Sequence, residues 1–202
     1  MGTARAMRQL GNQLLKNLRV PADDDGLIDA ISDAVNAVRG REVQLLPFVF
    51  PPSLPSGLWI DRTDRDIIAF DVKMRLEHKL VIIFHEIWHM FRGHCGSQTA
   101  HGPAASRALD DEFEGKLRDV VEAIVRITGT DVPSVGRMDA SLHVATRTSA
   151  GVAREEREAE QFGILFATEL QAALAEARST ADPANIAGRI GASMAHLRIR
   201  GS

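Results

Sequence analysis

The chain has 202 residues, of which 45% are hydrophobic and 25% charged, a size and composition typical of one globular domain with a substantial core. Its formal net charge of −3 argues against a nucleic-acid-binding surface as the main function. The single cysteine excludes an internal disulfide, and no apolar run is long enough for a secretory signal or a membrane span, so we expect a cytoplasmic protein.

The first part of the chain predicts two helices followed by a small sheet. Apolar residues at helical spacing indicate one helix over residues 3–19 and a second that ends at Gly40. Three strands are predicted, at residues 42–50, 58–60 and 66–70, and the last two form a β-hairpin. Pro47 confines the first strand to an edge of the sheet or to a bulge. We therefore expect an antiparallel sheet of three strands.

Residues 72–92 predict the most apolar helix of the chain. One stripe at helical spacing is formed by Leu76, Leu80, Phe84, Ile87 and Phe91, and further apolar residues fill the other faces. A helix that is apolar nearly all round is a buried one. This helix should therefore be the core helix, pressed against the sheet.

The rest of the chain predicts further helices. In order, we expect a loop at 93–106, a helix at 107–128, a weakly patterned stretch at 137–150, and helices at 154–178 and 183–198. The succession of elements predicts the α+β class. The expected single domain over 1–202 comprises the N-terminal helices in 1–41, the sheet and core helix in 42–95, a loop and an inserted helix in 96–150, and the last two helices in 151–202.

The core helix carries the stretch "FHEIWHMFRGHC" at 84–95, in which His85, Glu86 and His89 fit the pattern H-E-x-x-H. Positions i and i+4 of a helix lie on one face, so both imidazoles can reach one zinc ion. Glu86, beside the first ligand, can polarise a water molecule bound to that ion. Two histidines and a carboxylate can also hold iron or manganese.

A catalytic zinc site takes three protein ligands, and the third is not obvious from the sequence. The extended pattern H-E-x-x-H-x-x-G-x-x-H fails, because Arg92 and Cys95 occupy its last two positions. A Cys95 thiolate is a remote option, and the distant histidines His101 and His143 have no local support.

A glutamate from the helix at 154–178 is a stronger candidate. Glu155 and Glu158 share one helical face with Ala159, Phe162, Leu165 and Phe166, so a carboxylate could reach the metal while the apolar end packs on the core helix. The same acidic residues are equally typical of an exposed first turn, where negative charge favours a helix N-terminus. The residues alone leave both readings open.

Together, "FHEIWHMFRGH" and "EEREAEQFGILFATEL" resemble the ImmA/IrrE family of zinc metallopeptidases. In that family a second motif, E-x-E-A-x-x-F-A, lies on a helix packed against the H-E-x-x-H helix. The stretch "GLWIDRTDRDIIAF" also looks like the family's small sheet, so the likeness covers roughly residues 42–95 and 150–170. The resemblance implies zinc bound by His85, His89 and Glu158, with Glu155 as the alternative third ligand and Glu86 as general base.

The resemblance further implies a zinc-dependent endopeptidase that cleaves a specific protein, such as a separate helix-turn-helix transcriptional repressor. We expect no direct binding to nucleic acid or membranes. An extended peptide could pair with an exposed edge of the sheet. The chain has no tyrosine, so the donor to the oxyanion is left open among arginines and His94, His101 and His143.

The chain departs from the family pattern in three places, and two of these, Trp88 and the insertion, favour an alternative function. Trp88 stands where the family has a small residue, Gly163 replaces an alanine, and the 68 residues between His89 and Glu158 imply a helix inserted near the site. The alternative is a non-catalytic, zinc-stabilised regulatory or toxin-like protein that acts by binding a partner. In a third reading, H-E-x-x-H is a coincidence in a structural core helix.

Overall fold

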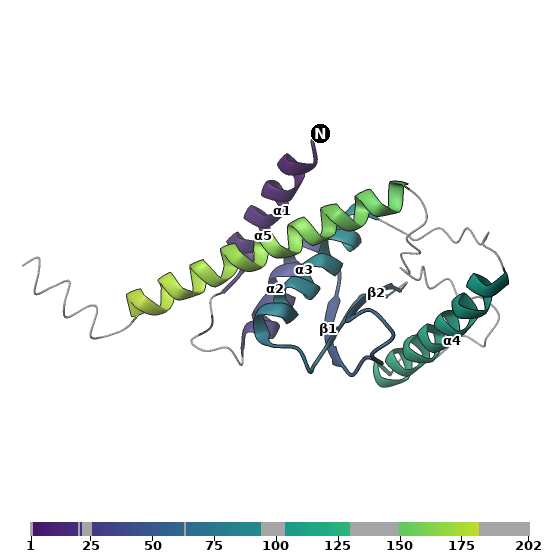
Figure 1. The fold of residues 1–202 in the computed structure, drawn as a ribbon. Coiled ribbons are helices and arrows are strands. Elements are labelled where there is room, and N and C mark those ends of the chain that lie inside the picture. Colours follow the sequence, from purple (N-terminus) through teal and green to yellow (C-terminus); the bar gives the residue numbers. More distant parts are fainter. Residues whose placement is uncertain are drawn as a thin grey trace, which may run out of the picture.

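The computed structural model of the chain describes residues 2–19, 21, 26–62, 64–93, 104–129 and 150–181. In chain order its elements are α1 (Thr3–Asn17), α2 (Leu27–Arg39), β1 (Val43–Phe48), β2 (Gly57–Asp61), β3 (Asp66–Asp71), α3 (Leu76–Arg92), α4 (Ala104–Ile127) and α5 (Ala150–Ala181) (Figure 1). These elements confirm the α+β class. The helix expected at 183–198 and most of the stretches 93–106 and 137–150 lie outside the described residues. Among the described helices, none combines the length and the apolarity that crossing a membrane requires.

The three strands form a mixed sheet in the order β1-β3-β2. The hairpin of β2 and β3 is antiparallel, as predicted, but β1 runs parallel to β3, so the expectation of an all-antiparallel sheet is wrong. The alternation of side chains along a strand specifies its faces and carries no information about its direction, which is set by the path of the chain between strands. Pro47 lies in β1 at the edge of the sheet, where a missing backbone N–H is tolerated.

The two faces of the sheet are covered by different helices (Figure 1). On one face Trp59, Ile68 and Phe70 belong to a core cluster that also contains residues of α1, α2, α3 and α5. The other face presents alternate residues, including Ile60 and Ile67, to a second cluster that contains the apolar side chains of α4. The inserted helix therefore lies across the sheet from α3, and the expectation that it sits near the metal-binding motif is not met.

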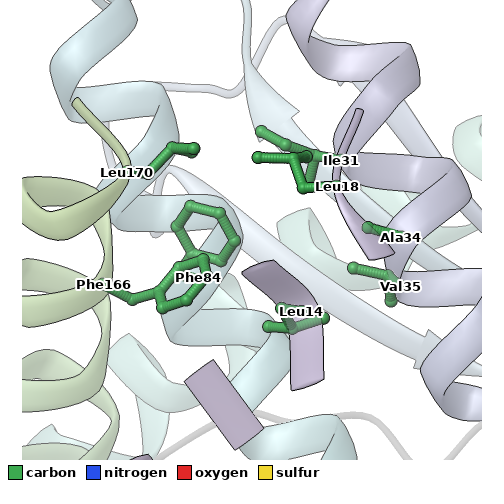
Figure 2. Close-up of a pocket in the computed structure, with 8 residues that line it drawn as sticks. All are labelled: Leu14, Leu18, Ile31, Ala34, Val35, Phe84, Phe166 and Leu170. Carbon is green, nitrogen blue, oxygen red and sulfur yellow. The ribbon is translucent and has the colours of Figure 1, made fainter. Parts of the chain in front are cut away.

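Helix α3 is the core helix that its composition predicted, with nearly all of its central residues buried. Helix α5 lies along it, and the rings of Phe84 and Phe166 meet edge to face with their centroids 4.5 Å apart. Figure 2 shows where these two helices meet α1 and α2, around a cavity of about 10 Å³ lined only by apolar side chains. A cavity this small and apolar stays dry and holds no ligand. The ionisable side chains that α3 and α5 bring together lie elsewhere along the contact of these two helices.

Candidate metal centre

His85 and His89 lie one turn apart on α3, as the pattern predicted. Their Nε2 atoms are 3.1 Å from each other, and the ring centroids are 4.7 Å apart. His89 is buried, whereas the side chain of His85 is 21% exposed. The two imidazoles therefore present their Nε2 atoms to one point at the edge of the core.

The third group at this point is Glu156 of α5. Its Oε1 lies 3.3 Å from Nε2 of His89, and its Oε2 lies 3.5 Å from Nε2 of His85. In a tetrahedral zinc site with bonds of about 2.0–2.1 Å, neighbouring donor atoms are about 3.3 Å apart. In the described part of the chain, no other three His, Cys, Asp or Glu side chains are gathered in this way. His85, His89 and Glu156 could thus hold one metal ion.

The predicted third ligand was Glu158, with Glu155 as its alternative, and the structure brings neither of them to the histidines. The Glu158 carboxylate accepts hydrogen bonds from the Thr3 hydroxyl of α1 and from the Arg154 guanidinium, each at 3.0 Å. Each residue of a helix is rotated by about 100° from the one before it, so Glu156 points away from the common face of Glu155 and Glu158. The carboxylate that the structure places beside the two histidines is therefore that of Glu156, in place of the predicted Glu158 or Glu155.

The error comes from the orientation assigned to α5. The predicted contact face included Leu165, whose side chain is 49% exposed, and ignored Gly163, which is buried. Ala159 of the predicted face is buried, and the face that meets α3 continues from it through Gly163 and Ala167, which are small buried residues spaced four apart. Glu156 lies two turns before Gly163 on this face, so the spacing of small residues is the signal that could have identified it.

Glu86 lies on the side of α3 that faces β2. Its carboxylate is buried and accepts a hydrogen bond from the backbone N–H of Trp59. A Cβ atom at Gly57 would lie only 3.0 Å from Oε1 of Glu86, so this glycine makes room for the side chain. Glu86 is therefore fixed between α3 and the edge strand β2, next to the two histidines.

The charges of this group shift the pKa values of its members. Burial raises the pKa of Glu86, and it stays above its usual range although the imidazoles of His85 and His89 lower it. Burial also raises the pKa of Glu156, but hydrogen bonds and charge from the two imidazoles outweigh burial and hold this pKa well below its usual range. Glu156 is thus an ionised carboxylate, the form in which a glutamate can bind a metal.

The pKa of His85 is raised overall. Burial lowers it, but the carboxylates of Glu156, Glu86 and Glu160 together have the larger effect. In the metal-free protein this environment favours a proton on the imidazole. A metal ion must displace that proton to bind at Nε2.

Trp88, which departs from the family pattern, is part of the core. Its ring is 1% exposed and stacks on Phe162 of α5, with the centroids 5.0 Å apart. The guanidinium of Arg92 lies over the indole ring, 5.6 Å from its centroid. The bulk of this side chain thus fills the contact between α3 and α5. The other candidates, His94, Cys95, His101 and His143, fall outside the described residues.

The chain matches no protein-family model, and it has no match among curated proteins or among solved structures. Its resemblance to the ImmA/IrrE peptidases stays a prediction based on the motif residues.

Proposed function

We propose that the protein is a zinc-dependent endopeptidase of the ImmA/IrrE type. His85, His89 and Glu156 would be the zinc ligands and Glu86 the general base. The observation that carries the proposal is the convergence of two imidazoles and a carboxylate from α3 and α5 beside a buried glutamate. Two histidines and a glutamate are the ligands of known hydrolytic zinc sites, where they leave a fourth position open.

Glu86 has the properties that a general base in such a reaction needs. A zinc ion, when bound, would lower the pKa of a water molecule and polarise the carbonyl of the scissile bond. Glu86 would take the proton of the attacking water on its carboxylate and pass it to the leaving amide nitrogen. The hydrogen bond from the Trp59 N–H holds the Glu86 carboxylate in place beside the two histidines.

The position of β2 supports a polypeptide as the substrate. Asp71 N–H donates to the Ser56 carbonyl and Arg62 N–H donates to the Arg65 carbonyl, which identifies the residue pairs that bond across the hairpin. The intervening residues, Gly57, Trp59 and Asp61, therefore direct their backbone groups to the outer edge of the sheet, where the Trp59 N–H already donates to the Glu86 carboxylate. An extended peptide could pair with this edge beside Glu86. The choice of a transcriptional repressor as substrate, and a cytoplasmic location, rest on the resemblance and the composition.

The test compares zinc-loaded wild type with zinc-loaded Glu86→Gln on a library of peptides, with cleavage read by mass spectrometry. The variant keeps a side chain of the same size but removes the base, so we expect cleavage by the wild type and a rate lower by about 10²–10⁴ in the variant. Zinc content, measured for both proteins, controls for loss of the metal. A wild type that carries one zinc per chain and cleaves neither the library nor any co-expressed repressor would contradict the proposal.

One observation favours the alternative of a non-catalytic, zinc-stabilised protein that binds a partner. The carboxylate of Glu86 already accepts a backbone hydrogen bond that ties α3 to β2, which is also a structural role. In that case zinc-loaded wild type would leave every peptide intact, and Glu86→Gln would lower the thermal stability without changing the biological effect.

A further inference from the structure

We infer that Gly163 is a positioning residue for the metal centre: its missing side chain lets α5 approach α3 closely enough for Glu156 to reach the two histidines. The inference rests on the metal ligands of the proposed function, and it assigns the placement of one of them to a residue that touches no metal.

The contact at Gly163 is made with the backbone of α3. A Cβ atom at this position would lie 2.6 Å from the carbonyl oxygen of Val81 and 3.3 Å from the backbone nitrogen of His85. Real Cβ atoms show essentially no contacts below 3.0 Å, and ordinary contact begins at 3.4 Å. Because the opposing atoms belong to a helix backbone, no side-chain rotation can relieve the overlap. A residue other than glycine must therefore move one helix away from the other.

This contact is close to the metal ligands on both helices. On α3, Val81 lies one turn before His85, and on α5, Gly163 lies two turns after Glu156, about 10 Å along the axis. Ala159, fully buried, continues the same face between Glu156 and Gly163. The separation of the helices at Gly163 therefore sets how far the Glu156 carboxylate stands from the imidazoles.

The metal centre leaves little room for such a movement. Relief of the overlap with Val81 requires a retreat of about 0.8 Å, the difference between 2.6 Å and 3.4 Å. Bonds to zinc tolerate deviations of only about 0.2 Å. The donor atoms of Glu156 already lie 3.3–3.5 Å from those of the histidines, so a retreat of this size takes the carboxylate out of the coordination shell.

Two other glycines inside described helices provide matched controls. A Cβ atom at Gly115 of α4 would meet nothing within 4 Å. At Gly11 of α1 it would come within 3.1 Å of the ring of Phe166, which is a side chain and not a helix backbone. Glycine inside a helix costs about 0.5–1 kcal/mol relative to alanine. Gly115→Ala therefore measures the helix-propensity gain alone, and Gly11→Ala measures the same gain together with a tightened helix contact.

The experiment measures the zinc affinity of the full chain by competition with a chromophoric chelator, for wild type, Gly163→Ala, Gly11→Ala and Gly115→Ala. Cobalt(II) is added separately, because its visible absorption is intense in a four-coordinate site and weak at higher coordination. We expect the zinc affinity of Gly163→Ala to be about 10–100-fold lower than that of the wild type, which is the usual effect of disturbing a residue that supports a metal ligand. We also expect this variant to lose the intense four-coordinate cobalt spectrum. The two controls should bind zinc as the wild type does, whatever their melting temperatures.

The outcomes separate this inference from the proposed function. A wild type that binds no zinc contradicts the metal centre itself, and the inference fails with it. A zinc-binding wild type and a Gly163→Ala variant of equal affinity overturn the inference and leave the metal centre standing. Should Gly163→Ala not fold, Ala159→Val takes its place, since it adds bulk on the same face one turn closer to Glu156. Wild-type affinity in folded Ala159→Val overturns the inference, and a loss of affinity supports it.

Discussion

Two carboxylates in the same turn of α5 have different surroundings. Glu156 lies against the imidazoles of His85 and His89, whereas Glu158 turns to the start of α1 and bonds to Thr3. The two glutamates belong to one acidic run, and only the neighbour that each one meets tells them apart. The candidate metal centre and the link between α5 and α1 thus use two glutamates that are separated by one residue.

The assignment of Glu156 as the third ligand predicts different effects for two alanine substitutions. Glu156→Ala removes a ligand, so it should reduce zinc affinity by more than the 10–100-fold that follows loss of a supporting residue. Glu158→Ala should keep about one zinc per chain, because its carboxylate bonds to Thr3 and Arg154 instead. Zinc content after gel filtration against a weak chelator measures both. The reverse pattern would restore Glu158 as the ligand.

At the scale of elements, the sheet is joined to α2 through Asp66, the first residue of β3. Its buried carboxylate accepts a hydrogen bond from the indole N–H of Trp59 in β2 at 3.0 Å and another from Arg39 at the end of α2 at 2.9 Å. The guanidinium of Arg41 lies 3.3 Å away, although without hydrogen-bond geometry. One carboxylate therefore connects β3 with β2, α2 and the start of β1.

Asp66→Ala should lower the free energy of unfolding by about 2–4 kcal/mol. The substitution removes the acceptor of the buried indole N–H of Trp59 and the counter-charge of Arg39, whereas Arg41 keeps its ion pair with Asp61. We place the effect below that of a fully buried pair, because the side chains of Arg39 and Arg41 are 24% and 31% exposed and can be hydrated. Urea unfolding measures the change.

Asp64→Ala is the matched control in the neighbouring turn. The side chain of Asp64 is 45% exposed and pairs with Arg65 at the surface. Exposed ion pairs contribute little, so this variant should unfold almost as the wild type does. Equal losses in the two variants would contradict the role assigned to Asp66.

At the scale of the whole molecule, the residues of the candidate metal centre join α5 to α3 by charge as well as by packing. In the metal-free protein the ionised Glu156 lies beside the imidazole of His85, whose pKa is raised, so that its protonated form is favoured. With metal bound, the same groups must be deprotonated. The stability of the fold should therefore depend on pH in opposite ways in the two states.

For the metal-free protein, we expect the free energy of unfolding to fall as the pH rises above 6.5, the pKa of an unperturbed histidine. The pKa of His85 is raised in the folded state, so its stabilising contribution is complete below 6.5 and is lost as the pH passes the folded value. Urea unfolding in excess chelator, between about pH 6 and pH 8, measures this fall. Glu156→Gln should make this fall in stability smaller, because the effect of burial on the pKa of His85 would then be opposed only by Glu86 and Glu160. A fall of unchanged size would contradict the contact assigned between Glu156 and His85.

Much of the fold could be predicted because it depends on local patterns. The helices of the described chain and the β2–β3 hairpin follow from apolar spacing and turn residues, and the two histidines with Glu86 follow from the i, i+4 geometry of one helix. The direction of β1 and the far-side position of α4 could not be predicted. Both depend on how the chain travels between elements, which periodicity does not encode.

By itself, the sequence determined the two histidines and the glutamate that share α3, because three residues within one turn and a half are placed by helix geometry alone. The tertiary structure decided which glutamate completes the group. That choice depends on the rotation of α5 about its axis and on its distance from α3. Both are set by small buried residues, above all Gly163. A residue without a side chain leaves no hydrophobic signal in the sequence, yet it determines how close two helices can come.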